Sequence, residues 1–226
     1  HHHRRHHHHH YHPTMLSCYY LDDDEVNVLP TKGSAEEAAA AAAAGAARAQ
    51  VGEDELRALG VLYWKLDADN YEKEGRLDQI CTERGYDYRD EVDSGKIPAL
   101  DEKLAMFFEE HLHTDEEIRF FLDGSGYFDV RDQREDAADG RWLRIHCGKG
   151  ALIVLPAGIY HRFAPDSRMH FRVLRLFQGE PVWTAHKRAK ADTEQLAARK
   201  KYKTEFVERK QKDAAAAAAA RTKADA

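Results

Sequence analysis

Two histidines and a glutamate stand close together in the segment HLHTDEE, which runs from His111 to Glu117. In a β-strand, side chains two residues apart point to the same face, so His111 and His113 can converge on one ion. A turn through Thr114 and Asp115 would bring Glu117 back to the same side. Neutral imidazoles with one carboxylate suit divalent metals such as iron, nickel, manganese and zinc. The segment therefore predicts a metal site, whereas a single histidine would more simply be a polar surface residue.

A further histidine follows an apolar run in GALIVLPAGIYH, residues 150–161. Gly150, Pro156 and Gly158 are turn-forming residues on either side of this run, and His161 begins the next strand. By itself, this pattern favours an ordinary strand-turn-strand hairpin with a histidine at the surface.

The segments that must position these residues have the two-residue period of β-strands. From His111 onward, short apolar stretches alternate with glycine, proline and charged turns, as in IRFFL, GYFDVR, RWLRIH, ALIVL and HFRVLRLF. Tandem short strands favour an antiparallel sandwich or barrel of the jelly-roll kind. Earlier in the chain, helical spacing predicts helices over residues 71–85 and about 100–110. The expected fold is mainly β, with a few peripheral α-helices.

The two ends of the chain differ in composition from its middle. Residues 1–52 join a histidine-rich start to an alanine-rich stretch, in which Ser34 and Glu37 have the spacing of a helix capping box. The start could be a tag, a leader or a metal-scavenging tail, and a leader without function is favoured. Residues 187–226 are charged and alanine-rich, which predicts a solvated helix or a disordered tail. One domain is therefore expected over residues 53–186.

Composition and charge narrow the classes of function. The 226 residues carry a formal net charge of -6, which gives no reason to expect a nucleic acid as partner. The alanine-rich stretch is too short and too weakly apolar to span a bilayer. The three cysteines form no CxxC pair and suggest no disulfide framework. We therefore expect a soluble monomer of the cytoplasm, with the nucleus left open, that binds neither membrane nor nucleic acid.

Together, the two histidine segments resemble the two motifs of the cupin superfamily. Each motif is matched at four positions, which are His111, His113, Glu117 and Gly124 in the first and Gly150, Pro156, Gly158 and His161 in the second. Ala105 and Pro165 depart from the usual pattern, but neither stands at a ligand position. The resemblance implies a cupin jelly-roll β-barrel with one bound metal ion. The metal ligands that it implies are His111, His113, Glu117 and His161.

Longer segments resemble the acireductone dioxygenase family. They are LGVLYWKLDAD (59–69), RGYDYRDEV (84–92), EEHLHTDEEIRF (109–120), GSGYFDVRD (124–132), LPAGIYHRF (155–163) and RLFQGEPVWTAH (175–186). This resemblance implies an enzyme of methionine salvage that cleaves acireductone, 1,2-dihydroxy-5-(methylthio)pent-1-en-3-one, with dioxygen. It also implies one Fe²⁺ or Ni²⁺ per chain. The iron form would give 4-methylthio-2-oxobutanoate and formate, and the nickel form methylthiopropionate, formate and carbon monoxide.

Strand parity indicates two arginines that would accompany the metal ligands. If Glu117 points inward, Arg119 and Phe121 do so too, and Arg175 shares a face with Val173. An inward arginine needs an anionic partner, because an unpaired buried charge is very costly. That partner is either the bound enediolate, or Glu117, or a core carboxylate in a structural ion pair. Glu117, Arg119 and Arg175 are therefore the predicted catalytic residues.

Phe163 shares a face with His161 and could line the pocket, although core packing explains its position equally well.

Other classes of function lack their motifs in this sequence. The chain has no GxSxG, GxxxxGK[ST] or HExxH motif, so nothing in it indicates a hydrolase, a nucleotide-binding protein or a zincin protease. The alternative of a different class is a catalytically idle cupin that binds a protein or stores metal. An idle cupin would be expected to lose a ligand, whereas this chain keeps all four ligand positions and both arginines.

Overall fold

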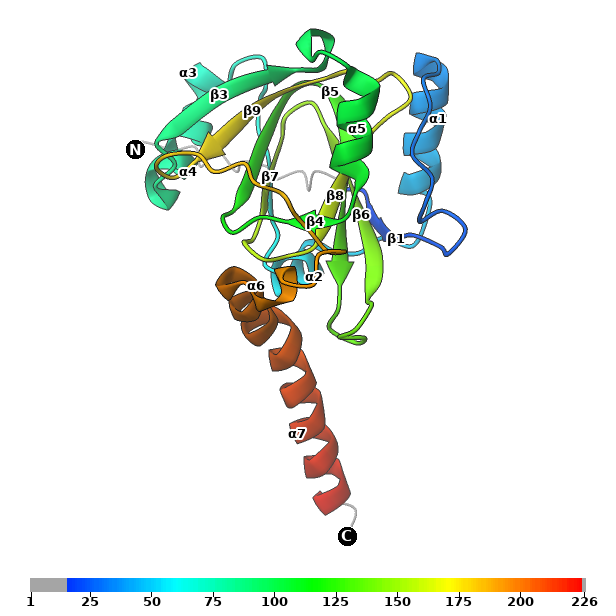
Figure 1. Cartoon of the computed structure of the whole chain (residues 1–226), viewed down its shortest axis with the longest axis vertical. Helices are drawn as coiled ribbons and strands as arrows, with labels where there is room; N and C mark the ends of the chain where they lie inside the picture. The colour runs from blue at the N-terminus through cyan, green and yellow to red at the C-terminus, as the bar shows by residue number, and fades with distance from the viewer. Residues whose placement is uncertain (1–15, 225–226) are drawn as a thin grey trace, which may run out of the picture.

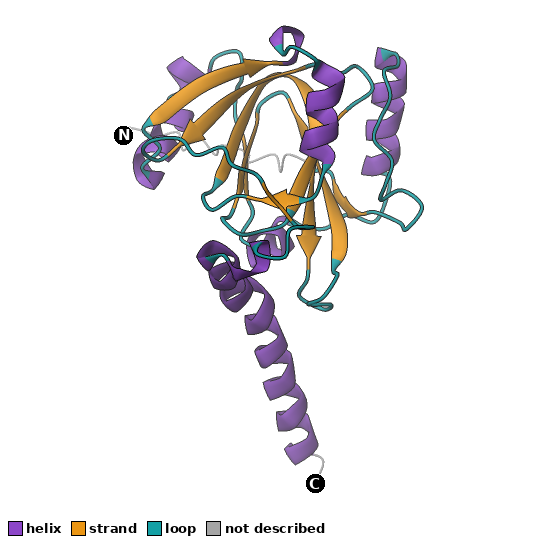
Figure 2. Ribbon diagram, in the orientation of Figure 1, coloured by secondary structure: helices purple, strands orange, loops and turns teal. Residues whose placement is uncertain are grey.

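Antiparallel strands rolled around one interior form the body of the protein, and helices lie on its outside (Figures 1 and 2). The structure is a computed structural model that describes residues 16–224. The strands are β1 (Cys18–Tyr20), β2 (Leu62–Lys65), β3 (Tyr88–Asp93), β4 (His111–Leu112), β5 (Glu117–Asp132), β6 (Arg141–Gly148), β7 (Ala151–Leu155), β8 (His161–Pro165), β9 (Phe171–Phe177) and β10 (His186–Lys187). The prediction of a mainly β fold is confirmed.

The helices lie around the strands on more than one side (Figure 1). They are α1 (Ala35–Ala46), α2 (Glu53–Ala58), α3 (Tyr71–Glu74), α4 (Arg76–Arg84), α5 (Leu100–Phe108), α6 (Ala197–Tyr202) and α7 (Arg209–Ala224). Two 3-10 helices, η1 (Ser94–Lys96) and η2 (Thr193–Gln195), and a π-helix, η3 (Lys203–Glu208), complete the set. In Figure 1, α5 runs along the barrel and α7 projects away from it. Among the described residues, no helix is long and apolar enough to cross a membrane.

Strand β5 holds the two halves of the barrel together. Its first residues pair with β7 and β9, whereas its later residues pair with β6 and β8. The strand bends between these halves, where the register with β9 shifts between Phe121 and Asp123. Gly124 follows with φ at 70°, and a Cβ there would collide with the carbonyl oxygen of His170. Glycine is therefore required at this position, because other residues would be strained and would not fit.

Side chains of β5 alternate between two apolar clusters. Phe121 and Phe128 lie in the interior, in contact with residues such as Ile153, while Phe120 belongs to a second cluster beneath α4 that includes Leu77. This alternation is the two-residue period expected from the sequence. Because the period holds on both sides of the bend, β5 presents side chains to the interior along its whole length.

The helical expectations are confirmed with shifted boundaries. The helix expected over residues 71–85 is broken into α3 and α4, because Gly75 adopts φ at 73° between them. The capping box is present at α1, where the Ser34 hydroxyl accepts a hydrogen bond from the Glu37 backbone N–H. Strand β1, by contrast, was not expected: it pairs with β6, and Cys18 is fully buried. The histidine-rich start falls outside the described residues, and the domain boundaries stay a prediction.

The beginning of the predicted C-terminal tail packs against the barrel. Helix α7 is exposed along its length, as expected for a solvated helix. Arg199, Tyr202 and Val207, however, are only 1%, 2% and 1% exposed. Arg199 donates hydrogen bonds to the Gly158 carbonyl at 3.1 Å and to the Gln133 side-chain oxygen at 2.6 Å. The expectation of a solvated segment is therefore wrong for α6 and η3. Their few buried side chains are interspersed with many charged residues, so the composition of the segment indicates a solvated helix.

We expect Arg199→Met to lower the free energy of unfolding by about 2–4 kcal/mol, because two buried oxygens would lose their donor. Urea denaturation followed by circular dichroism measures this change. Lys201→Met is the matched control, since Lys201 lies in the same helix with a side chain that is 76% exposed. Equal effects of the two substitutions would show that the contacts of Arg199 do not stabilise the fold.

Candidate metal centre

The side chains of the four predicted metal ligands lie close together in the interior of the barrel. His111, His113, Glu117 and His161 each offer one ligand atom, and these atoms lie within 4.8 Å of one another. Strand pairing accounts for the convergence: β4 places His111 directly opposite His161 on β8, and Glu117 opens β5. The two motifs, far apart in the chain, thus become one cluster.

A backbone carbonyl holds each of the three imidazole rings. The distances from Nδ1 to a carbonyl oxygen are 2.6 Å for His111 to Glu109, 2.7 Å for His113 to Thr184, and 3.0 Å for His161 to Ile159. A carbonyl oxygen only accepts hydrogen bonds, so the Nδ1 atom of each ring is the donor. In a neutral imidazole the Nε2 atom is then left with a free lone pair. This is the tautomer and orientation of a histidine that ligates a metal.

Glu117 is a buried carboxylate held in its ionised form. Its Oε2 atom lies 3.0 Å from Nε2 of His113 and 2.9 Å from Nε2 of His161, and its Oε1 atom lies 3.4 Å from the Arg119 guanidinium. Burial would raise the pKa of Glu117, but Arg119 and the neighbouring histidines hold it well below its ordinary value. Burial lowers the pKa of His111 to about 3, which keeps that ring neutral. One ionised oxygen and three imidazole nitrogens fit a divalent metal ion.

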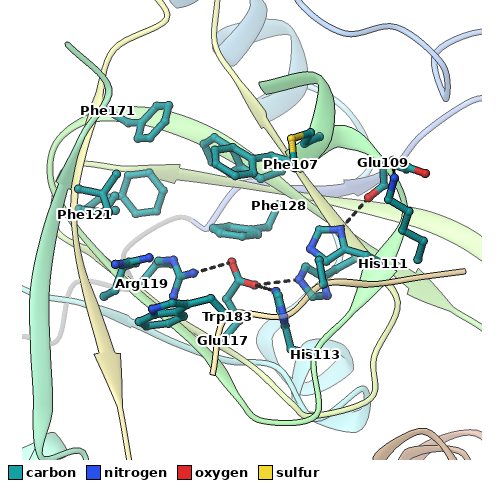
Figure 3. Close-up of a pocket in the computed structure, with 18 residues that line it drawn as sticks. Phe107, Glu109, His111, His113, Glu117, Arg119, Phe121, Phe128, Phe171 and Trp183 are labelled. Carbon is teal, nitrogen blue, oxygen red and sulfur yellow. Dashed lines mark hydrogen bonds and ion pairs between the residues drawn. The ribbon is translucent and has the colours of Figure 1, made fainter. Parts of the chain in front are cut away.

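The cluster lies at one end of a cavity of about 410 Å³. The other end is apolar, and Figure 3 shows Phe121 and Phe171 there, away from His111 and His113. The apolar lining residues include Val92, Met106, Phe107, Phe121, Phe128, Phe163, Phe171 and Val173. A polar, charged end beside an apolar end suits a ligand with a chelating head and an apolar tail.

Both predicted arginines line this cavity, but their partners differ. Arg119 faces Glu117, whereas Arg175 makes two hydrogen bonds to Asp90, at 2.8 Å and 2.5 Å. Asp90 also accepts a hydrogen bond from the Tyr88 hydroxyl at 2.8 Å. Arg175 therefore has a carboxylate partner in an ion pair, but Asp90, with its side chain 30% exposed, is half-buried and does not belong to the core.

Asp90 is a residue beside the site that the sequence did not reveal, and Trp183 lines the cavity although the sequence assigned it no chemistry. The Arg175 guanidinium lies 4.0 Å from the centre of the Trp183 ring, and the Arg119 guanidinium lies 5.6 Å from it. Both cations thus lie near the indole ring, whose π face favours positive charge. RGYDYRDEV indicated only the resemblance to the family, and no local spacing connects Asp90 with an arginine 85 residues along the chain.

We expect Glu117→Gln to lower the affinity for a divalent metal by at least about tenfold, because the cluster loses its only anionic ligand. Metal content after dialysis against a weak chelator measures this, using protein without residues 1–14, so that the histidine-rich start binds no metal. His170→Gln is the control, since His170 pairs with Asp123 on the surface, outside the cluster. A full metal complement in Glu117→Gln would exclude Glu117 as a ligand.

Comparison with known proteins gives the same picture over most of the chain. Residues 34–185 match the model of the ARD/ARD' family. The acireductone dioxygenase of Homo sapiens is 54% identical over 140 residues, which are 61% of this chain and 75% of the human protein. Acireductone dioxygenase 3 of Arabidopsis thaliana is 53% identical over 156 residues, which are 68% of this chain and 74% of the plant protein.

Among solved structures, an acireductone dioxygenase from Bacillus anthracis with a cadmium ion in its active center is similar, with a TM-score of 0.51 and 26% identity. The similarity covers 58% of this chain and 86% of the bacterial chain. The family match spans more than half of the chain and contains all four residues of the cluster. The chain therefore belongs to the ARD/ARD' family.

Proposed function

We propose that this protein is a metal-dependent dioxygenase that cleaves acireductone with dioxygen in methionine salvage. One observation carries the proposal: three histidines, each hydrogen-bonded to a backbone carbonyl, and an ionised glutamate form a cluster at one end of a cavity whose other end is apolar. Relatives that are 53–54% identical to this chain over 140–156 residues are named acireductone dioxygenases. A small molecule with an anionic enediol head and an apolar tail matches both ends of the cavity.

His111, His113, Glu117 and His161 would hold the metal ion, for which we propose Fe²⁺ or Ni²⁺ at one per chain. When bound, the ion supplies a Lewis acid and a template on which the electron-rich enediolate is oriented for reaction with dioxygen. Three nitrogens and one carboxylate oxygen accept either metal. We therefore propose that the metal present selects the products, with carbon monoxide formed only by the nickel form.

Arg119 is the residue that we propose contacts the substrate head. Its side chain is only 16% exposed, and it pairs with Glu117, which is itself one of the proposed ligands. A buried cation whose partner also faces a metal ion still favours a further anion, and the enediolate provides one. The charge of Arg175, by contrast, is already balanced by Asp90. We propose that Arg175 holds the Trp183 indole in place as a wall of the cavity.

The idle cupin is the remaining alternative, and no described contact favours it, because the full ligand set and both arginines are present in the cavity. That the protein is a cytoplasmic monomer without nucleic-acid or membrane partners stays a prediction.

Reconstitution with metal decides between the enzyme and the idle module. Protein without residues 1–14 is loaded with either iron(II) or nickel(II), and acireductone loss and carbon monoxide are followed under oxygen. We expect rapid loss with both metals and carbon monoxide from nickel alone, whereas no loss above the metal-free blank would favour the idle module.

We expect Arg119→Leu to raise KM for acireductone by about tenfold or more, because a charge-assisted hydrogen bond to the head is lost. The bound metal should stay at one per chain. Steady-state kinetics with metal analysis tests this, and Arg172→Leu serves as the control because Arg172 pairs with Glu91 at the surface. An unchanged KM, or a loss of metal, would instead make Arg119 a structural support of Glu117.

A further inference from the structure

Gly126 is a glycine that the backbone does not require. It lies in β5 opposite Pro165 of β8, and its φ is not in the left-handed region that favours glycine. A Cβ at this position would lie 2.5 Å from both Cε2 and Cζ of Phe163. Such a distance is far shorter than any ordinary van der Waals contact, so the ring and an added methyl group cannot share this space. Because Gly126 has no side chain, the tip of the Phe163 ring can occupy the space that a Cβ atom would fill.

Phe163 itself is a wall of the apolar end of the cavity. Its ring centre lies 5.2 Å from that of Phe128 and 5.1 Å from that of Phe171. Both neighbours are packed into the core, with 2% and 4% of their surface exposed, and they leave no room for sideways movement. Phe163 is only partly buried, and its open side faces the cavity. A ring displaced from Gly126 would consequently move into the cavity.

We propose that Gly126 determines the length of the substrate tail that this protein accepts, by allowing the Phe163 ring to lie against the backbone of β5. This inference rests on the proposed function, because it assumes that the tail of the substrate occupies the apolar end. Of the chain's 14 glycines, all within the described residues, Gly126 is the only one whose added Cβ would meet a side chain that lines the cavity. Its effect is thus on specificity and not on metal binding.

A matched pair of glycine substitutions isolates this effect. Gly126→Ala removes the space beneath the ring, whereas Gly148→Ala adds the same methyl group where the nearest side-chain atom is 3.8 Å away. Gly148 lies on the neighbouring strand β6, opposite Ser125, and also lacks a positive φ. The double variant Gly126→Ala with Phe163→Leu gives back room and serves as the rescue.

Binding is measured by calorimetry on the full chain loaded with nickel(II). The probes are straight-chain 2-oxo acids with the same chelating head and tails from methyl to butyl. Nickel held by the histidine-rich start adds the same background to every variant and does not depend on the tail. We expect Gly126→Ala to lower the affinity for the butyl probe by roughly tenfold or more, which is the effect of excluding one methylene group. The affinity for the methyl probe should not change. Gly148→Ala should match the original protein, and the double variant should recover the butyl probe.

Equal weakening of the methyl and butyl probes, or no weakening at all, would overturn the proposal. The proposal would also be overturned if the original protein bound all probes with the same affinity, since the apolar end would then not receive the tail. If Gly126→Ala does not fold, Phe163→Leu alone decides, because it should strengthen binding of a hexyl probe, and an unchanged affinity counts against the proposal. Acireductone turnover is measured in parallel. Its absence, with the tail dependence intact, would contradict the proposed reaction and leave the role of Gly126 standing.

Discussion

The buried negative charge of Glu117 is the feature that governs the arrangement of the interior. An ionised carboxylate in an apolar barrel is stable only if positive charge and hydrogen-bond donors surround it. Here the Arg119 guanidinium, 3.4 Å away, provides the positive charge, and the Nε2 atoms of His113 and His161 lie 3.0 Å and 2.9 Å from the carboxylate. The adjacent cation, Arg175, has its own carboxylate in Asp90 and does not compete for Glu117. This separation of partners leaves one anionic ligand at the centre of three imidazoles.

One ring that faces Glu117, that of His113, is held by a backbone group from a distant part of the chain. Thr184 provides the carbonyl that holds His113, and β10 pairs with β4 beside it. Behind them, the Gly158 N–H donates to the His113 carbonyl, and the Gly158 carbonyl accepts from Arg199. Residues beyond the family match thus support a ligand loop. The C-terminal segment is therefore part of the framework of the site until α7 leaves the body (Figure 1).

One strand connects the two ends of the cavity. Strand β5 contributes Glu117 and Arg119 before its bend and Phe128 after it, and Gly126 lies between the bend and Phe128. The charged end and the apolar end consequently have a fixed separation, because both are set by residues on the same backbone. A change at Gly126 can alter the apolar end without moving the metal ligands. Head recognition and tail recognition are in this way separate properties of the cavity.

Local spacing in the sequence was enough to predict the main strands after His111, the face shared by Glu117 and Arg119 and the ligand types, because the two-residue period sets which face each side chain takes. It did not reveal β1 or β3. His161 needed the resemblance to a known motif, since its own hairpin carries no signal of a ligand. Only the tertiary structure decided that Asp90 partners Arg175 across 85 residues, that Thr184 holds His113 across 71, and that Arg199 is buried. Such contacts depend on how separate strands and helices are packed together, and packing of distant segments leaves no periodic pattern in the sequence.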